Sequence, residues 1–232
     1  MGYTRAQIIE KCRKAFQNKN TLYKQEFVNY RGKTTDTKEY YTEVIAEFLC
    51  DNITNYINGI DCITRKNSYK TKRHDGLYDS DSNREEEKIA MQFFLQSRDY
   101  SAFSLIGKIE DYQTPLKSSA DDEAGKIDLL SYDDKTMRIL ELKKPDSKET
   151  MLRCVLEGYT YLKTVNNDKL IKDFKHNPKE VILKASPFVF FEGEQHKEMT
   201  QPRPQLRKLM KLLDSKPYYY IKENLKYVVV EE

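Results

Sequence analysis

The sequence lacks the features typical of membrane proteins, disulfide-rich secreted proteins and zinc proteins. No apolar run approaches the roughly 20 residues that span a bilayer, and residues 1–14 are charged throughout, without the apolar segment of a secretory signal. The four cysteines and three histidines are scattered, without the spacing of a disulfide framework or a zinc site. We therefore expect a cytoplasmic protein with reduced thiols and no membrane partner.

A strong excess of one charge is also missing. The net charge is +3, charged residues make up 33% of the chain and hydrophobic residues 38%, as in soluble globular proteins. Composition alone therefore does not indicate nucleic-acid binding. Basic residues nevertheless gather in two segments, 65–74 and 203–216. Each segment either follows a phosphate backbone or forms an ordinary solvated surface.

Three segments of the first hundred residues have the apolar spacing of amphipathic helices. They are residues 4–16, 37–53 and 84–97, in which apolar side chains recur at i, i+3, i+4 and i+7. Residues 68–83 are rich in Lys, Asp, Ser and Gly and are predicted to form a loop. We expect an N-terminal helical region over 1–83, packed on or appended to a core over 84–232.

The pattern changes to strands after residue 102. Strands are predicted over 103–113, 126–134, 137–144 and 181–191, and a strand or hairpin over 218–230. Helices are predicted over 147–165, with a capping box of Asp146 and Glu149, and over 204–215. This order indicates an α/β (α+β) fold: a mixed sheet flanked by helices, with an αβββαβ core and an N-terminal helical extension.

One acidic-x-Lys tripeptide stands apart from the others. Seven (D/E)-x-K tripeptides occur in the chain, but only Glu141-Leu142-Lys143 lies in an apolar strand that follows a second apolar strand with an acid, Asp128. Side chains two residues apart share one face of a strand, so Glu141 and Lys143 point the same way. Pairing the two strands is expected to bring both carboxylates and the ammonium into one pocket.

Charged side chains inside apolar strands are costly to bury unless they are paired or bound to a metal. Two neighbouring carboxylates suit Mg²⁺, which takes oxygen ligands together with water and substrate phosphate. Such an ion and a nearby lysine are the groups that phosphodiester hydrolysis needs. The alternative is a buried ion pair of Lys143 with Glu141 or Asp128 that only sets the strand register.

These residues, with the order of elements over about residues 84–192, resemble the PD-(D/E)xK nuclease superfamily, which has the restriction endonuclease-like fold. The resemblance implies a Mg²⁺-dependent deoxyribonuclease, with Mn²⁺ able to substitute, in restriction, repair or a phage or mobile element. It implies that Asp128, Glu141 and the carbonyl of Leu142 bind the metal and that Lys143 assists the attacking water. Ile127 stands at the position of the proline that gives the motif its name.

Two further elements extend the resemblance. Members of the family often carry a glutamate on the helix before the first core strand, and Glu86 lies on the inward stripe of that helix. Arg153, Glu157 and Tyr161 recur every four residues and are similar to a Q-x-x-x-Y substrate-binding motif, with Glu157 replacing Gln. The alternatives are a charged first turn for Glu86, and a surface pair of Arg153 with Glu157 beside a core Tyr161.

Rival interpretations remain at this point. A protein with the same fold but without cleavage activity would only bind DNA or a protein, and we call this alternative a silent module. A histidine-centred nuclease would depend on His176, which has no second histidine at useful spacing. Residues 218–220 are three tyrosines that either stack on bases or belong to the core. DNA against RNA, endonuclease against exonuclease, and monomer against homodimer are also left open.

Overall fold

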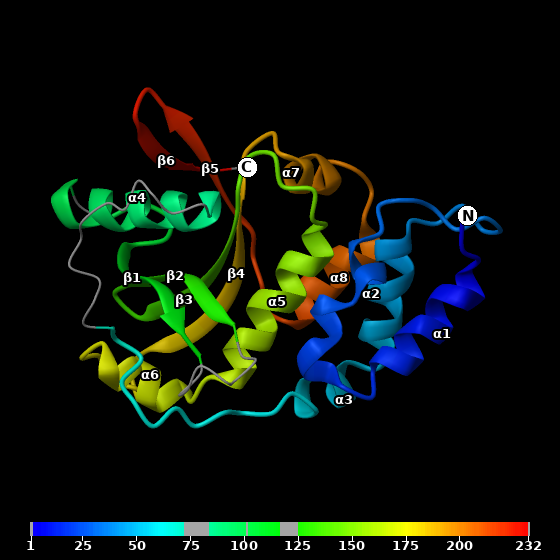
Figure 1. The fold of residues 1–232 in the computed structure, drawn as a ribbon, viewed down its shortest axis with the longest axis horizontal. Coiled ribbons are helices and arrows are strands. Elements are labelled where there is room, and N and C mark those ends of the chain that lie inside the picture. The colour runs from blue at the N-terminus through cyan, green and yellow to red at the C-terminus, as the bar shows by residue number, and fades with distance from the viewer. Residues whose placement is uncertain (1, 72–83, 101, 117–124, 232) are drawn as a thin grey trace.

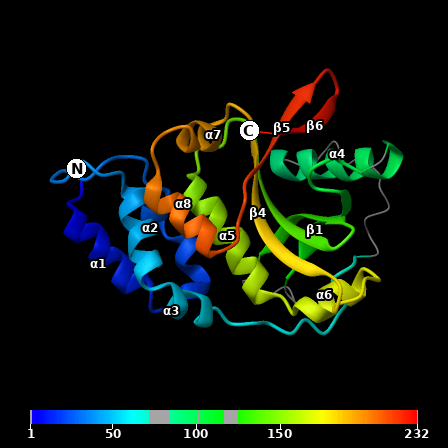
Figure 2. The ribbon, with the colours of Figure 1, turned by 180° about the vertical axis from the view of Figure 1, so that it is seen from behind.

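A mixed sheet with helices on both faces forms the centre of the protein. The computed structural model describes residues 2–71, 84–100, 102–116 and 125–231. Helix α4 covers one face of the sheet and α5 the other, and the N-terminal helices lie beyond α5 together with α8 (Figure 1). The same layers are seen from behind in Figure 2, where β4 runs between α5 and the α4 side of the molecule.

The sheet has six strands in the order β1-β2-β3-β4-β5-β6. The pairs β1–β2, β2–β3 and β5–β6 are antiparallel, whereas β3–β4 and β4–β5 are parallel. The strands are β1 Lys108–Pro115, β2 Lys126–Asp133, β3 Thr136–Lys143, β4 Ile182–Phe190, β5 Tyr218–Glu223 and β6 Lys226–Val230. Because β3 and β4 are parallel, the chain must cross back between them, and α5 makes this crossing.

The helices fall into an N-terminal group, two sheet-covering helices and shorter C-terminal ones. The N-terminal group is α1 Arg5–Ala15, the 3₁₀ helices η1 Lys19–Lys24 and η2 Glu26–Asn29, α2 Tyr41–Asp51 and α3 Ile53–Asn58. The others are α4 Glu85–Tyr100, α5 Met151–Thr164, α6 Asn167–Asp173, α7 Glu194–Met199 and α8 Pro204–Leu212. The element order from α4 to β4 is thus the predicted αβββαβ, with α6 added before β4.

Alternation along β3 divides the buried side chains between the two faces of the sheet. Met137 and Ile139 join the core under α5, whereas Leu140 and Leu142 join the core under α4. Every β3 residue after Thr136 is buried. The charged residues of β3 therefore lie inside the protein, as the sequence pattern predicts.

The N-terminal helices share a continuous apolar core with α5 and α8. Ile8 of α1 and Ile45 of α2 belong to the same cluster of buried residues as Leu156 of α5 and Leu209 of α8. Helix α2 packs directly on α8, and η1 packs on α5. Residues 2–60 thus cover the outer face of α5 rather than forming a separate body.

The predicted strands and helices are confirmed with shifted boundaries. The first strand begins at Lys108, five residues later than expected, because residues 103–107 form a turn that ends at Gly107 with φ +79°. A side chain at Gly107 would lie 2.1 Å from the carbonyl oxygen of Tyr132, so this turn requires glycine. The last segment is a hairpin, and α6 and α7 are short helices that the sequence pattern does not indicate.

The prediction that Asp146 caps α5 is wrong. The helix begins at Met151, and its N-cap is Thr150, whose hydroxyl accepts a hydrogen bond from the amide of Arg153 at 3.2 Å. Asp146 is exposed and pairs with Lys144 at 3.2 Å instead. A Thr hydroxyl satisfies an orphan amide as well as a carboxylate does, so sequence alone does not decide between neighbouring caps.

Part of the predicted loop and one histidine lie outside the residues that the structure describes. Within the predicted loop over 68–83, residues 72–83 lie outside the described residues, as does His74. All four cysteines are free thiols, and only Cys62 is exposed. Among the described helices, none combines the length and the apolar character needed to cross a bilayer.

Candidate active site

Strands β2 and β3 bring Asp128 close to Glu141. Their register ends with the pair Leu129 and Leu140, which Asp128 and Glu141 adjoin, and the charge of Asp128 contributes to the raised pKa of Glu141. The carboxylate of Asp128 accepts one hydrogen bond from the amide of Leu142 and one from the side chain of Gln113, both at 3.0 Å. These two donors hold Asp128 against the backbone between Glu141 and Lys143.

Lys143 lies within a group of three carboxylates. Its ammonium is 2.7 Å from Glu141, 2.9 Å from Glu149 and 3.5 Å from Glu157. The side chains of Lys143 and Glu141 are only 5% and 4% exposed. The ammonium is therefore shared between its own strand, the residue before the N-cap of α5 and the middle of α5.

Helix α5 supplies Glu157, one of the partners of Lys143, and packs closely on the strand that carries the lysine. A side chain at Gly158 would lie 3.4 Å from the Cβ of Glu141, so the helix packs closely on β3 at this point. One turn further, the hydroxyl of Tyr161 donates to Glu157 at 2.9 Å and lies 3.5 Å from the hydroxyl of Tyr23. Tyr161 is thus buried and also orients Glu157 toward the lysine.

Arg153 does not form the surface pair with Glu157 that the sequence leaves open. Its guanidinium pairs with Glu149 at 3.0 Å. Glu149 therefore joins Arg153 to Lys143, with one carboxylate oxygen toward each. All three residues of the predicted substrate-binding set, Arg153, Glu157 and Tyr161, lie beside the Asp128–Glu141–Lys143 group, with Arg153 reaching it through Glu149.

Glu86 reaches the site from the first turn of α4. Its carboxylate accepts a hydrogen bond from the amide of Lys144 at 3.3 Å. Burial is the main cause that raises the pKa of Glu86 above its usual range. Its neighbour Glu85 instead pairs with the exposed side of Lys144 at 2.5 Å. Of the acidic residues that open this helix, Glu86 is the one held against the end of β3.

The site contains more carboxylates than nearby cations. Burial is the main cause that raises the pKa of Asp128 to about 7; Glu86 and Glu157 add to the rise and Lys143 opposes it. Burial and then Glu157 raise the pKa of Glu141 well above its usual range. Burial lowers the pKa of Lys143, but the neighbouring groups, Glu141 first among them, together outweigh this effect, so the net shift is upward and the amine stays charged.

An open groove of about 890 Å³ lies in front of this group. Glu86 and Asp128 both line it, and Glu141 and Lys143 do not. Its remaining lining comes from the first turn of α4, from β1 and from the segment between β3 and α5: Arg84, Glu85, Glu87, Gln113, Lys144, Asp146, Ser147, Lys148 and Glu149. The lining holds three cations against six carboxylates, so it carries an excess of negative charge that a bound cation would offset.

The donors at the site fit a small divalent cation in part. Asp128 and Glu141 supply two neighbouring carboxylates, and the excess of negative charge around them is what such an ion relieves. Among the described residues, however, no three His, Cys, Asp or Glu side chains gather into a ready-made metal cluster. Mg²⁺ commonly uses only one or two carboxylates and completes its shell with water and phosphate, so this donor set is sufficient.

Two contributors were missed in the sequence. Glu149 was assigned to the start of the following helix, and its position before the Thr150 N-cap is what lets it reach Lys143. Gln113 stands in β1 with φ +48°, an irregularity that turns its amide toward Asp128 and that no alternation pattern reveals. The only signal for either residue was a polar side chain near an apolar element.

The histidine alternative has little geometric support. The ring of His176 stacks on Tyr132 at 3.8 Å, and its nearest acid is Glu110 at 3.9 Å. His196 packs between Phe191 and Tyr219. Both described histidines therefore serve as aromatic packing partners.

Comparison of the chain with protein-family models, curated proteins and solved structures gives no match. The assignment of function therefore depends on the geometry of the side chains described above.

Proposed function

We propose that the protein is a Mg²⁺-dependent nuclease of the PD-(D/E)xK type, which hydrolyses phosphodiester bonds of DNA. The observation that carries this proposal is the buried Glu141–Lys143 pair of β3 with Asp128 of the neighbouring β2 held against the amide of Leu142, next to a groove that Asp128 and Glu86 line. Ordinary structural ion pairs balance their charges, whereas this group holds a surplus of carboxylates around one ammonium. A surplus of this kind is expected where a cation binds.

Different residues of the site have different chemical roles in this proposal. Asp128, Glu141 and the carbonyl of Leu142 would hold Mg²⁺, with Glu86 at the edge of the same group. When bound, the ion supplies Lewis-acid stabilisation of the phosphate and a more acidic water. Lys143, kept charged by Glu149 and Glu157, offsets the negative charge that develops on the phosphate and orients the attacking water.

Around the reacting groups, other side chains hold the substrate and the lysine. Lys144 and Lys148 lie on the groove and attract the phosphates next to the one that is cleaved. Tyr161 keeps Glu157 turned toward Lys143 through its 2.9 Å hydrogen bond. The hydroxyl of Tyr220 donates to the carbonyl of Lys143 at 2.8 Å and fixes the end of β3 from the other face of the sheet.

A second candidate is a silent module that binds DNA without cutting it. One observation favours it: Glu141 and Lys143 pair with each other behind the groove and do not line it. Cleavage requires Glu141 to exchange this ion pair for the metal, a rearrangement that a purely structural pair does not undergo.

A cleavage assay separates the two candidates. Plasmid, linear, single-stranded DNA and RNA substrates are incubated with Mg²⁺, Mn²⁺ or EDTA, and product ends are mapped. The nuclease proposal expects metal-dependent products that Asp128→Asn and Lys143→Met abolish, whereas Lys135→Met, at an exposed turn, retains them. Binding by a folded wild-type protein without any product under either metal would establish the silent module instead.

A further inference from the structure

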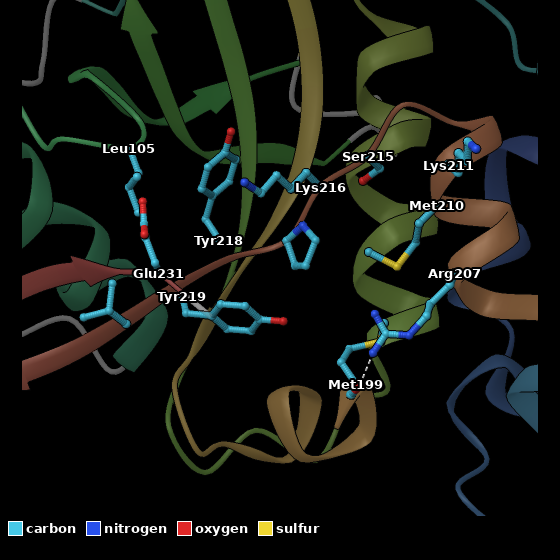
Figure 3. Close-up of a pocket in the computed structure, with 12 residues that line it drawn as sticks. Leu105, Met199, Arg207, Met210, Lys211, Ser215, Lys216, Tyr218, Tyr219 and Glu231 are labelled. Atoms are coloured by element: carbon cyan, nitrogen blue, oxygen red, sulfur yellow. Dashed lines mark hydrogen bonds between the residues drawn. The ribbon is translucent and has the colours of Figure 1, made fainter. Parts of the chain in front are cut away.

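A second groove, of about 560 Å³, lies between α8 and the start of β5, apart from the residues of the acidic site. Figure 3 shows Leu105 and Tyr218 on the β5 side, Met210 and Arg207 on the α8 side, and Tyr219 between them. Two features that the sequence leaves open thus meet in one hollow, which is lined by part of the basic segment over 203–216 and by the first two of the tyrosines over 218–220.

The charge of this groove is mainly positive. Arg207, Lys211 and Lys216 line it, against a single carboxylate, Glu231. In the described part of the chain, none of the three cations forms an ion pair, and Arg207 donates only to the carbonyl of Met199. Unpaired cations at a concave surface attract an anionic ligand more strongly than lysines on a flat face do.

A buried hydroxyl also faces this groove. Ser215 is 6% exposed, and its hydroxyl has no hydrogen-bond partner among the described residues. Its backbone amide is already satisfied by the carbonyl of Met210 at 2.9 Å. Buried polar groups are nearly always hydrogen-bonded, so a buried hydroxyl without a partner, on a residue that lines a cationic groove, points to a ligand with acceptor oxygens.

The walls of the groove are apolar and aromatic. Tyr218 is half-buried, its hydroxyl accepts from Arg138 at 3.2 Å, and the ammonium of Lys216 lies 5.7 Å from the centre of its ring. Met199 and Met210 add flexible thioether surface beside it. A flat apolar group with an attached anion matches this combination of walls and charges.

We propose that the α8–β5 groove binds single-stranded nucleic acid. In this arrangement Arg207, Lys216 and the Ser215 hydroxyl contact a phosphate, and a base packs against Tyr218. A concave hollow of this size admits an unstacked nucleotide, whereas bases inside a duplex do not reach an aromatic wall. The inference deepens the proposed function, on which it rests for the class of substrate.

Binding is measured in EDTA, so that cleavage plays no part. The intact chain is titrated against a fluorescein-labelled oligothymidylate of about 12 nucleotides, and fluorescence anisotropy gives Kd. We expect Tyr218→Leu to raise Kd about tenfold, because one base loses its stacking surface, and Tyr218→Phe to change it less than about twofold. Lys216→Gln should reduce the slope of log K against log salt by about 0.7, whereas the exposed Lys179→Gln leaves it unchanged.

Three results would overturn the inference. They are the absence of oligothymidylate binding by the wild type, equal binding by the Tyr218→Leu and Lys216→Gln variants, and equally effective displacement by an acidic peptide or by duplex DNA. The nuclease proposal fails separately, through the absence of metal-dependent products. Groove-dependent binding without cleavage would support this site and the silent module together.

Discussion

At the residue scale, the positive charge of Lys143 stabilises the buried carboxylates around it. Glu141, Glu149 and Glu157 all lie within 3.5 Å of its ammonium. Lys143→Met removes that charge and leaves buried carboxylates without a partner. We expect the variant to lower the free energy of unfolding by about 3–5 kcal/mol, measured by urea denaturation.

The adjacent Lys144 provides the matched control. It pairs with Glu85 and Asp146, whose side chains are 65% and 72% exposed. Exposed pairs contribute little, so Lys144→Met should leave the free energy of unfolding almost unchanged. Equal losses from the two substitutions would contradict the buried ion-pair network around Lys143.

Asp128 is expected to make stability depend on pH. The pKa of its folded form is raised to about 7, above the unfolded value of about 3.9, so the folded state holds the proton more tightly. Stability is then highest below the unfolded pKa and falls as pH rises toward 7. Asp128→Asn removes the cost of deprotonating this buried carboxyl group. We therefore expect its effect on the free energy of unfolding to be about 2 kcal/mol more stabilising at pH 8 than at pH 4.

The comparison requires thermal or urea unfolding of both proteins at each pH, in EDTA. The expected stability difference is smaller than the value that the full pKa shift would give, because part of Asp128 faces the open groove. A stability difference between wild type and Asp128→Asn that stays constant from pH 4 to pH 8 would contradict the raised pKa.

At the element scale, the start of α5 determines where Glu149 lies. Thr150 caps the helix through its hydroxyl, which also donates to the carbonyl of Val28 at 3.0 Å. We expect Thr150→Ala to lower the free energy of unfolding by about 1–2 kcal/mol, since it removes a cap and a buried hydrogen bond. Asp146→Ala should change it by less than about 0.5 kcal/mol, because Asp146 is exposed and outside the helix.

Urea denaturation of the two variants decides between the predicted and the observed cap. A larger loss from Asp146→Ala than from Thr150→Ala would place the start of the helix where the sequence pattern put it. Glu149 would then lie in the first turn, on a different part of the helix surface.

The elements that were predictable from the sequence are those with a strong local period. The β2–β3 hairpin follows from two apolar runs around residues 133–135, and α5 follows from its long apolar stripe. The boundaries of β1 and α5 depend on Gly107 and Thr150, which act through single contacts and leave no periodic signal. Short helices such as α6 are stabilised by tertiary packing, which a sequence pattern does not show.

The residues of the candidate site also divide into those with a local sequence signal and those that depend on tertiary contacts. The proximity of Glu141 and Lys143 was predictable because charged residues two apart in an apolar strand share one face, and Asp128 was predictable as a charge in the neighbouring apolar strand. Glu149 and Gln113 reach the site by a helix cap and a backbone irregularity, and both depend on the folded chain. Tertiary contacts of this kind are the part of a site that sequence reasoning alone does not reach.

At the scale of the whole molecule, the N-terminal helices and the C-terminal helix α8 are joined by a buried carboxylate. Glu43 of α2 accepts hydrogen bonds from the amides of Gln205 and Leu206 at 2.9 and 3.0 Å. The N-cap of α8 is Arg203, which makes no side-chain cap of its own. A residue of the first fifty therefore serves as the cap of a helix that begins at residue 204.

Because the two regions share this cap and one apolar core, we expect the protein to unfold as a single unit. Glu43→Ala should lower the free energy of unfolding by about 2–3 kcal/mol, since two buried amides lose a charged acceptor. Glu47→Ala, which removes only the partly exposed pair with Arg5, should cost less than about 1 kcal/mol. Far-UV circular dichroism and tyrosine fluorescence should report the same shifted midpoint for Glu43→Ala, whereas an early separate transition would show that the N-terminal helices unfold independently of the sheet.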